Sequence, residues 1–129
     1  MIKFFLFLLI LTSCNKNNDK EINEKLIIMK KKEISGEINI ANGKNIFNGA
    51  CATCHLYGTG GSIQLKDKIK WDKIIQKKPL DEIYNNVLNG YVSENGYMPK
   101  KGACLSCSDQ DLIDAVNYIF SINGIIIEN

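Results

Sequence analysis

The motif Cys51-Ala52-Thr53-Cys54-His55 is the feature that most restricts how this chain can fold. Two thiols separated by two residues and followed directly by an imidazole form the attachment pattern of a c-type haem. The thiols add to two vinyl groups along one edge of the porphyrin, and the adjacent imidazole then reaches the iron. His55 is the only histidine in the chain. The motif therefore predicts a fold built around one covalently bound haem, with His55 as an iron ligand.

Two other uses of this motif compete with haem attachment. A redox-active Cys-x-x-Cys pair does not need the histidine that follows it here. A structural zinc site needs four ligands, and Cys104 and Cys107 could supply a second pair beside Cys51 and Cys54. A haem-free zinc lipoprotein is therefore not excluded by cysteine number. It would leave His55 without a role, so the sequence favours haem.

The N-terminal segment predicts export and a lipid anchor. Residues 4–11 form an unbroken apolar run, too short for a membrane span of about 20 residues and typical of a signal peptide. The run ends at Leu11-Thr12-Ser13-Cys14, which resembles the bacterial lipobox, where cleavage precedes an acylated cysteine. The alternative is an ordinary secretory signal with an incidental cysteine. We expect three segments: a signal peptide over residues 1–13, a tether anchored at Cys14 over residues 14–35, and a folded domain over residues 36–129.

Charge and size limit the remaining possibilities. The chain has 129 residues, a formal net charge of +2 and no arginine. This balance gives no support to nucleic-acid binding. A folded domain of roughly 90 residues buries only a modest part of its surface. A bound haem would supply much of the apolar core that such a short chain lacks.

The pattern of apolar residues predicts helices and no strands. The clearest helix is the last, because Ser108 is a good N-cap, Asp111 occupies the third helical position and an apolar stripe follows. Residues 58–61 and 91–107 are rich in turn formers and are expected to be loops. We therefore predict an all-α fold. The expected helices cover residues 40–50, 80–89 and 109–122.

The second iron ligand must come from elsewhere in the chain, and the three methionines are the candidates. Met1 leaves with the signal peptide and Met29 lies in the expected tether, whereas Met98 precedes Pro99 in a segment just before the last helix. A thioether is a soft, neutral ligand that raises the reduction potential of haem iron. The alternative is that Met98 only fills a gap in the core. We expect Met98 to bind the iron.

The chain resembles the class I c-type cytochromes, and most of all the small bacterial cytochrome c-five group. The resemblance covers about residues 40 to 122 and rests on two blocks: the attachment motif followed by a glycine-rich turn and Trp71, and residues 88–109 running into the last helix. It implies a small all-α fold with helices packed around one haem. It also implies a disulfide between Cys104 and Cys107 that braces the methionine loop. Gly43 and Phe47 are then expected to pack against the last helix near Tyr118.

The chain departs from the family pattern at three places. Ile63 replaces the proline whose carbonyl accepts a hydrogen bond from the histidine ligand, and Lys100 replaces a second proline after Met98-Pro99. Residues 92–96 look like a small insertion before the ligand loop. A run of lysines around Trp71 is either a docking face for an acidic partner or an ordinary solvated surface. Its members are Lys66, Lys68, Lys70, Lys73, Lys77 and Lys78.

The resemblance implies an electron-transfer protein rather than an enzyme. The expected protein is a periplasmic or otherwise extracytoplasmic one-electron carrier of a respiratory chain, anchored to a membrane by lipid, with His55 and Met98 as axial ligands. Its expected partners are redox proteins, with a respiratory bc complex or a terminal oxidase as family-level suggestions. No nucleic acid and no small-molecule substrate are expected. The alternative is a haem-based sensor or enzyme in which Met98 is labile.

Overall fold

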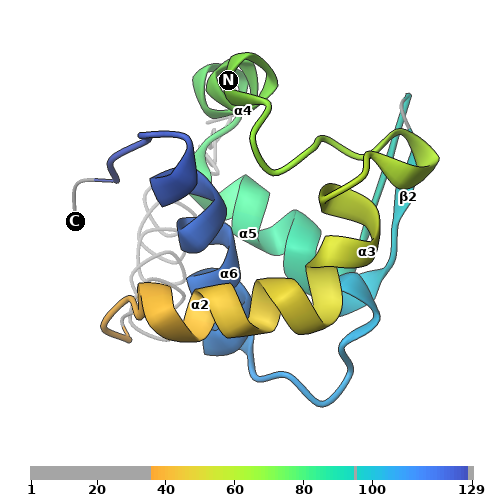
Figure 1. Ribbon diagram of the computed structural model, residues 1–129. Coiled ribbons are helices and arrows are strands. Elements are labelled where there is room, and N and C mark those ends of the chain that lie inside the picture. Colours follow the sequence, from red (N-terminus) through yellow and green to blue (C-terminus); the bar gives the residue numbers. More distant parts are fainter. Residues whose placement is uncertain (1–35, 95, 128–129) are drawn as a thin grey trace, which may run out of the picture. The chain divides into compact units, whose positions relative to one another are not determined.

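Helices dominate the described part of the chain, as predicted. The computed structural model describes residues 36–94 and 96–127, so the predictions for the signal peptide, Cys14 and the tether lie outside the described residues. No helix within these two ranges is long and apolar enough to cross a bilayer. Figure 1 shows helices enclosing the centre of the described part. In chain order the helices are α2 (Ile40–Ile46), a π-helical turn η1 (Phe47–Cys51), α3 (Ala52–His55), a 3-10 turn η2 (Thr59–Gly61), α4 (Lys68–Lys77), α5 (Leu80–Asn89), a 3-10 turn η3 (Lys100–Ala103) and α6 (Asp109–Ile122).

The predicted helices are confirmed, two of them to the residue. The first continues beyond its expected end, because η1 and α3 follow α2 without a break as far as His55. At the start of α6, the Ser108 hydroxyl accepts from the Asp111 backbone N–H and the Asp111 carboxylate accepts from the Ser108 N–H. This capping box satisfies two backbone donors that would otherwise lack partners. Asn123 caps the other end, and Gly124 follows with a positive φ of 69°.

Two elements differ from the sequence prediction. Helix α4 was not predicted, because its lysines interrupt the apolar stripe; it begins where the Asp67 side chain accepts from the Lys70 N–H. The expected loop over residues 91–107 contains an antiparallel hairpin of β1 (Tyr91–Ser93) and β2 (Gly96–Met98). Strands of three residues are too short for alternation to be recognised.

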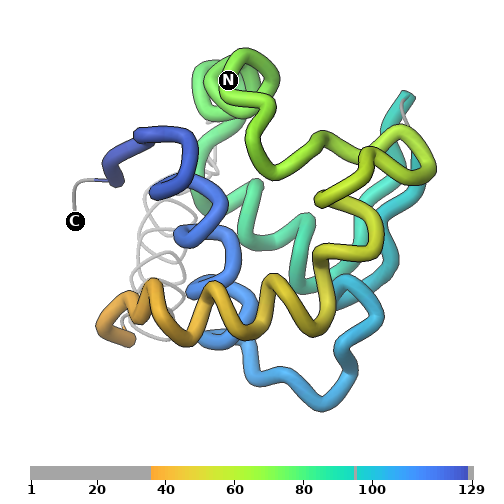
Figure 2. The backbone as a smooth tube through the Cα atoms, viewed as in Figure 1, coloured from red at the N-terminus to blue at the C-terminus, as the bar shows by residue number. Residues whose placement is uncertain are grey.

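The crossing of α2 and α6 joins the two ends of the described chain (Figure 2). At the crossing, a Cβ atom on Gly43 would lie 2.1 Å from the backbone oxygen of Asp114, so only glycine fits without displacement. One turn further, the rings of Phe47 and Tyr118 lie 5.6 Å apart. The carboxylate of Asp114 is buried, and it accepts from the Asn39 N–H and the Asn42 amide. The packing expected of Gly43 and Phe47 is therefore present.

The core extends from this crossing toward α4 and α5. Trp71 is the one buried residue of α4, and its ring lies 6.4 Å from that of Phe120, while Ile74 and Ile75 pack partly buried against the core. Its largest fully buried side chains are Phe47, Phe120 and Leu112. The amide of Asn123 donates to the carbonyl of Leu65, 58 residues earlier, and so fixes the segment after His55 to the end of α6.

Candidate cofactor-binding site

The attachment motif straddles the junction of η1 and α3. Cys51 ends the π-helical turn, and Cys54 and His55 lie in the short helix that follows. Both thiols are free, with Cys51 half-buried and Cys54 exposed. Burial, reinforced by the nearby Cys54, raises the pKa of the Cys51 thiol to about 11. Cys51 is therefore a neutral thiol at pH 7.

The His55 ring is held by a hydrogen bond on one of its two nitrogens. Nδ1 lies 2.8 Å from the carbonyl oxygen of Ile63, so it is the donor, and Nε2 keeps its lone pair for a metal. The residue that replaces the family's proline thus still offers its carbonyl to the histidine. The centroid of the Trp71 ring lies 6.0 Å from that of His55.

The segment between His55 and α4 is braced by hydrogen bonds from both sides. The indole N–H of Trp71 donates to the Gln64 carbonyl at 2.9 Å, and the Leu65 N–H donates to the His55 carbonyl at 2.6 Å. The Ser62 hydroxyl lies 2.8 Å from the Cys54 carbonyl. These contacts set the direction of the Ile63 carbonyl, and hence the orientation of the imidazole.

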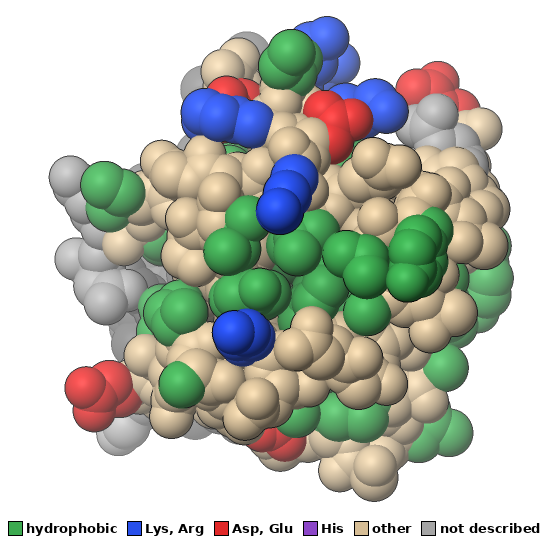
Figure 3. Space-filling model, in the orientation of Figure 1, with side chains coloured by type: hydrophobic (Ala, Val, Ile, Leu, Met, Phe, Trp, Pro, Cys, Tyr) green, Lys and Arg blue, Asp and Glu red, His purple; other side chains and the backbone are tan. Residues whose placement is uncertain are grey.

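A large cavity opens beside the motif. Its volume is about 810 Å³, and both His55 and Met98 line it, together with Cys51 and Cys54. Figure 3 shows apolar side chains lining a hollow on this face, with lysine side chains at its border. The size and apolar lining suit a flat macrocycle, and the two thiols and the imidazole nitrogen supply the bonds that a c-type haem needs. The apolar wall comes mainly from Ile63, Trp71, Ile74, Ile83, Val87, Leu112, Val116 and Ile119.

Met98 is positioned by the hairpin and by the turn after α5. It ends β2, where it pairs with Tyr91 across the two strands. Gly90 has a φ of 87°, and a Cβ atom there would lie 3.0 Å from the Lys100 nitrogen and 3.2 Å from the Met98 oxygen. The backbone at Gly90 therefore packs closely against the backbone of Met98 and Lys100, on either side of Pro99. The hairpin, which the sequence pattern does not predict, is therefore the element that positions Met98 at the cavity.

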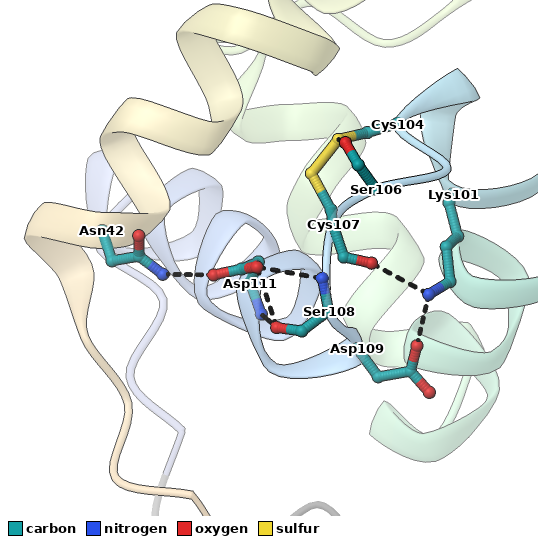
Figure 4. Close-up of a disulfide and its surroundings, with 8 residues drawn as sticks. All are labelled: Asn42, Lys101, Cys104, Ser106, Cys107, Ser108, Asp109 and Asp111. Atoms are coloured by element: carbon teal, nitrogen blue, oxygen red, sulfur yellow. Dashed lines mark hydrogen bonds and ion pairs between the residues drawn. A yellow bond between two sulfur atoms is a disulfide. The ribbon is translucent and has the colours of Figure 1, made fainter.

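A disulfide between Cys104 and Cys107 closes the segment that follows Met98. Figure 4 shows Lys101 reaching across this segment, with Nζ 2.9 Å from the Cys107 carbonyl and 2.7 Å from a carboxylate oxygen of Asp109. Cys104 and Cys107 are therefore not available as zinc ligands, because the sulfur atoms of a disulfide are not thiolates. Within the described ranges, no three His, Cys, Asp or Glu side chains are grouped to hold a metal ion. The four-cysteine zinc alternative has no support in this geometry.

The lysine run is divided between residues that line the cavity and residues that do not. Lys66 and Lys68 do not line the cavity, and Lys68 is paired with Asp72 at 3.0 Å. The other four border the cavity. The sequence alone does not show which lysines face the cavity, because its pattern does not predict that α4 is a helix. They are Lys70, Lys73, Lys77 and Lys78.

Comparison with known proteins gives matches over the same part of the chain. Residues 38–119 match the family model described as cytochrome C oxidase, cbb3-type, subunit III. The chain is 32% identical over 79 residues to cytochrome c-555 of Chlorobaculum tepidum, covering 61% of this chain and 72% of the relative. It is 33% identical over 79 residues to cytochrome c-555 of Chlorobaculum thiosulfatiphilum, covering 61% and 91%. It is 31% identical over 93 residues to cytochrome c6 of Pyropia yezoensis, covering 69% and 76%.

Proposed function

Because this chain belongs to the class I c-type cytochromes, a family of electron carriers rather than enzymes, we propose that it binds one haem c through Cys51 and Cys54 and passes single electrons between redox proteins. The observation that carries this proposal is the cavity of about 810 Å³ into which both thiols, the His55 ring and the Met98 side chain open. Bound there, the haem would supply a one-electron couple between ferric and ferrous iron.

Each protein group has a defined task in this proposal. Cys51 and Cys54 would hold the macrocycle by thioether bonds. His55 would offer Nε2 to the iron, while its hydrogen bond to the Ile63 carbonyl fixes the ring and would raise the basicity of the ligand. Met98 would hold the iron through its sulfur, a neutral ligand that would favour the reduced state and raise the potential.

An iron held by both His55 and Met98 would favour a carrier over a sensor or enzyme. The Met98 backbone is held by strand pairing with Tyr91 and by the close approach of Gly90. A methionine held in this way would leave no position on the iron for a substrate or a diatomic gas. The apolar wall would keep water away from a bound haem, which would limit the solvent rearrangement that accompanies a change in charge.

We place this carrier outside the cytoplasm, held to a membrane by a lipid on Cys14, and in a respiratory chain. The apolar run over residues 4–11 and the Leu11-Thr12-Ser13-Cys14 motif support export and acylation. The description of the matching family model names an oxidase subunit, which supports a terminal oxidase as electron acceptor. Labelling of cells with a radioactive fatty acid is expected to mark the wild type and not Cys14→Ser; equal labelling would remove the anchor from the proposal.

Optical spectra of the exported protein test the haem and its ligands. We expect a c-type spectrum on reduction, the weak long-wavelength band of methionine-ligated ferric haem on oxidation, and no change when carbon monoxide meets the reduced protein. Met98→Ala is expected to lose that band, to bind carbon monoxide, and to lower the midpoint potential by on the order of 0.2 V, within the roughly 0.8 V that axial ligands span.

Met29→Ala is the matched control and is expected to retain the wild-type spectrum and potential. A wild type that binds carbon monoxide rapidly would instead establish an open or labile sixth position, and the sensor or enzyme would replace the carrier. A protein without any haem absorbance would contradict both.

A further inference from the structure

The mouth of the cavity is bordered by two chemically different sides. Helix α4 and the residue after it contribute four lysines to the border. Residues of β1 and β2 contribute a second side, which includes Val92 and Tyr97. The cationic side and the apolar side therefore belong to one continuous rim, and Lys78 joins them because its Nζ lies 4.8 Å from the centroid of the Tyr91 ring.

Two of the four lysines are already engaged by carboxylates. Lys70 is paired with Asp67 at 3.1 Å, and Lys78 is paired with Glu82. Lys73 and Lys77 are exposed, and neither forms an ion pair within residues 36–94 and 96–127. They stand one helical turn apart, so their ammonium groups lie on the same side of α4. This side presents two positive charges beside the cavity that are not held in ion pairs among the described residues.

The hairpin presents apolar surface next to these charges. Val92 and Tyr97 are opposite each other across the strands, and they are 74% and 70% exposed. Cross-strand partners project from the same face of a hairpin, so the two side chains form one patch. The hairpin is held in place at its tip, because a Cβ atom on Gly96 would lie 2.2 Å from the Gly60 oxygen. A fixed, exposed apolar patch bordering a cofactor cavity is typical of an interaction surface.

We propose that Lys73, Lys77, Val92 and Tyr97 form a docking face for a redox protein whose own contact surface carries carboxylates beside an apolar patch. This inference deepens the proposed carrier function and rests on it. The two lysines would guide the encounter at long range, and the hairpin patch would hold the complex at short range. One electron passes from the donor protein to the acceptor protein at this face, and no bond forms or breaks.

The charge complementarity decides between possible occupants. A second copy of this chain would bring Lys73 and Lys77 against a rim that carries four lysines and one carboxylate, Glu94, so self-association through this face is disfavoured. A partner that carries carboxylates gains from the same two charges. The apolar patch is small, so the complex is expected to be weak and short-lived, as electron-transfer encounters are.

The lysines are tested by stopped-flow electron transfer from the reduced holoprotein to an acidic blue-copper protein. Lys73→Glu and Lys77→Glu are each expected to slow the second-order rate about tenfold at low ionic strength, with the difference disappearing at high ionic strength. Lys66→Glu is the matched control, because it changes the net charge equally and Lys66 is exposed but does not line the cavity. An equal loss in Lys66→Glu would contradict a local docking face.

The same variants test whether these lysines neutralise the carboxylates of the haem instead. In that case Lys73→Glu and Lys77→Glu would shift the midpoint potential, and the rate loss would persist at high ionic strength, which would overturn the proposal. We expect the potential to stay at the wild-type value in both variants.

The hairpin patch is tested with Val92→Ser/Tyr97→Ser. This variant is expected to weaken the complex with the same blue-copper protein about fivefold at every ionic strength, because it removes apolar contact and no charge. An unchanged dissociation constant would overturn the role of the hairpin. Oxidation of the wild type by hexacyanoferrate distinguishes failure of the docking face from failure of the carrier function. Rapid one-electron oxidation with a c-type spectrum would support the carrier function even if the docking face fails.

Discussion

Asn117 shows how much a single buried amide can determine. Its side-chain nitrogen donates to the Tyr84 hydroxyl at 2.9 Å and to the Ile113 carbonyl at 2.8 Å, and it is buried on α6. Both of its N–H groups are therefore used, and the contact ties α5 to α6 beneath the cavity wall. A buried donor that loses its acceptor costs about 1–3 kcal/mol.

Tyr84→Phe is expected to lower the free energy of unfolding by about 1–3 kcal/mol at pH 7, because one N–H of Asn117 loses its acceptor. Burial, with a smaller contribution from the Asp114 charge, raises the pKa of Tyr84 above its ordinary value. A raised pKa means that the folded state favours the neutral phenol. The stabilisation is complete below the unfolded pKa of about 10 and is lost as the pH rises through the folded pKa.

Urea unfolding of the holoprotein at pH 7 and at about pH 11 checks this prediction. The difference in the free energy of unfolding between wild type and Tyr84→Phe should be smaller at the higher pH. Tyr97→Phe, at an exposed position, should follow the wild type at both. A gap that stays constant would show that Tyr84 does not titrate differently in the folded state.

At the same scale, the sequence identified the residues of the motif but not how they are held. The spacing of Cys51, Cys54 and His55 is local, and the structure has the same three side chains opening on one cavity. The direction of the Ile63 carbonyl depends on the hydrogen bonds that brace the segment after His55. That segment is also fixed to the end of α6 by a bond from Asn123 to Leu65 across 58 residues, which no nearby pattern reveals.

At the scale of elements, the crossing of α2 and α6 depends on the absence of a side chain at Gly43. A methyl group there would meet the Asp114 backbone oxygen at 2.1 Å, and a helix backbone cannot move aside cheaply. Gly49, in the π-helical turn that follows, has no atom within 4 Å of an added Cβ. The two glycines are thus opposite cases within one continuous helical segment.

Gly43→Ala is expected to destabilise the protein by about 1–3 kcal/mol through overpacking, although alanine gains up to about 1 kcal/mol in helix propensity. Gly49→Ala should be neutral or up to about 1 kcal/mol more stable. Thermal unfolding followed by circular dichroism compares the pair. Equal melting temperatures would contradict a close approach at the crossing.

Helices that combine start and stop signals with a clear apolar stripe could be predicted from the sequence, and the other elements could not. Helix α6 begins at a Ser108 capping box and carries a clear apolar stripe, so its range follows from sequence. Helix α4 buries only Trp71, so its pattern looks like a charged loop. The hairpin depends on contacts beyond its own residues, since Gly96 packs on Gly60 and Gly90 on the backbone around Pro99.

At the scale of the whole molecule, the cavity makes the fold dependent on what fills it. An unfilled volume costs about 24 cal/mol per Å³. The 810 Å³ cavity is lined largely by apolar side chains, so the haem-free fold lacks packing contacts along this lining. Helices α4, α5 and α6, which form the walls of the cavity, would then have no shared group to pack against.

Cys51→Ala/Cys54→Ala, which cannot attach haem, is expected to keep much of its helical circular dichroism but to lose its near-ultraviolet signal and to bind a hydrophobic dye. Cys104→Ser/Cys107→Ser is the control. It should retain haem and fixed packing while losing about 2 kcal/mol of loop-closure stabilisation. A haem-free variant with native near-ultraviolet dichroism and no dye binding would show that the polypeptide alone specifies the fold.

The pairing of α2 with α6 also sets an order of events in time. The helical segment that carries Cys51 and Cys54 precedes α6 in the chain. Until α6 packs across that segment, Gly43 has no partner at the crossing, and the cavity lacks the wall that Leu112, Val116 and Ile119 supply. The two thiols are then most accessible, so we expect covalent loading to precede the packing of α6, which closes the structure over the bound cofactor.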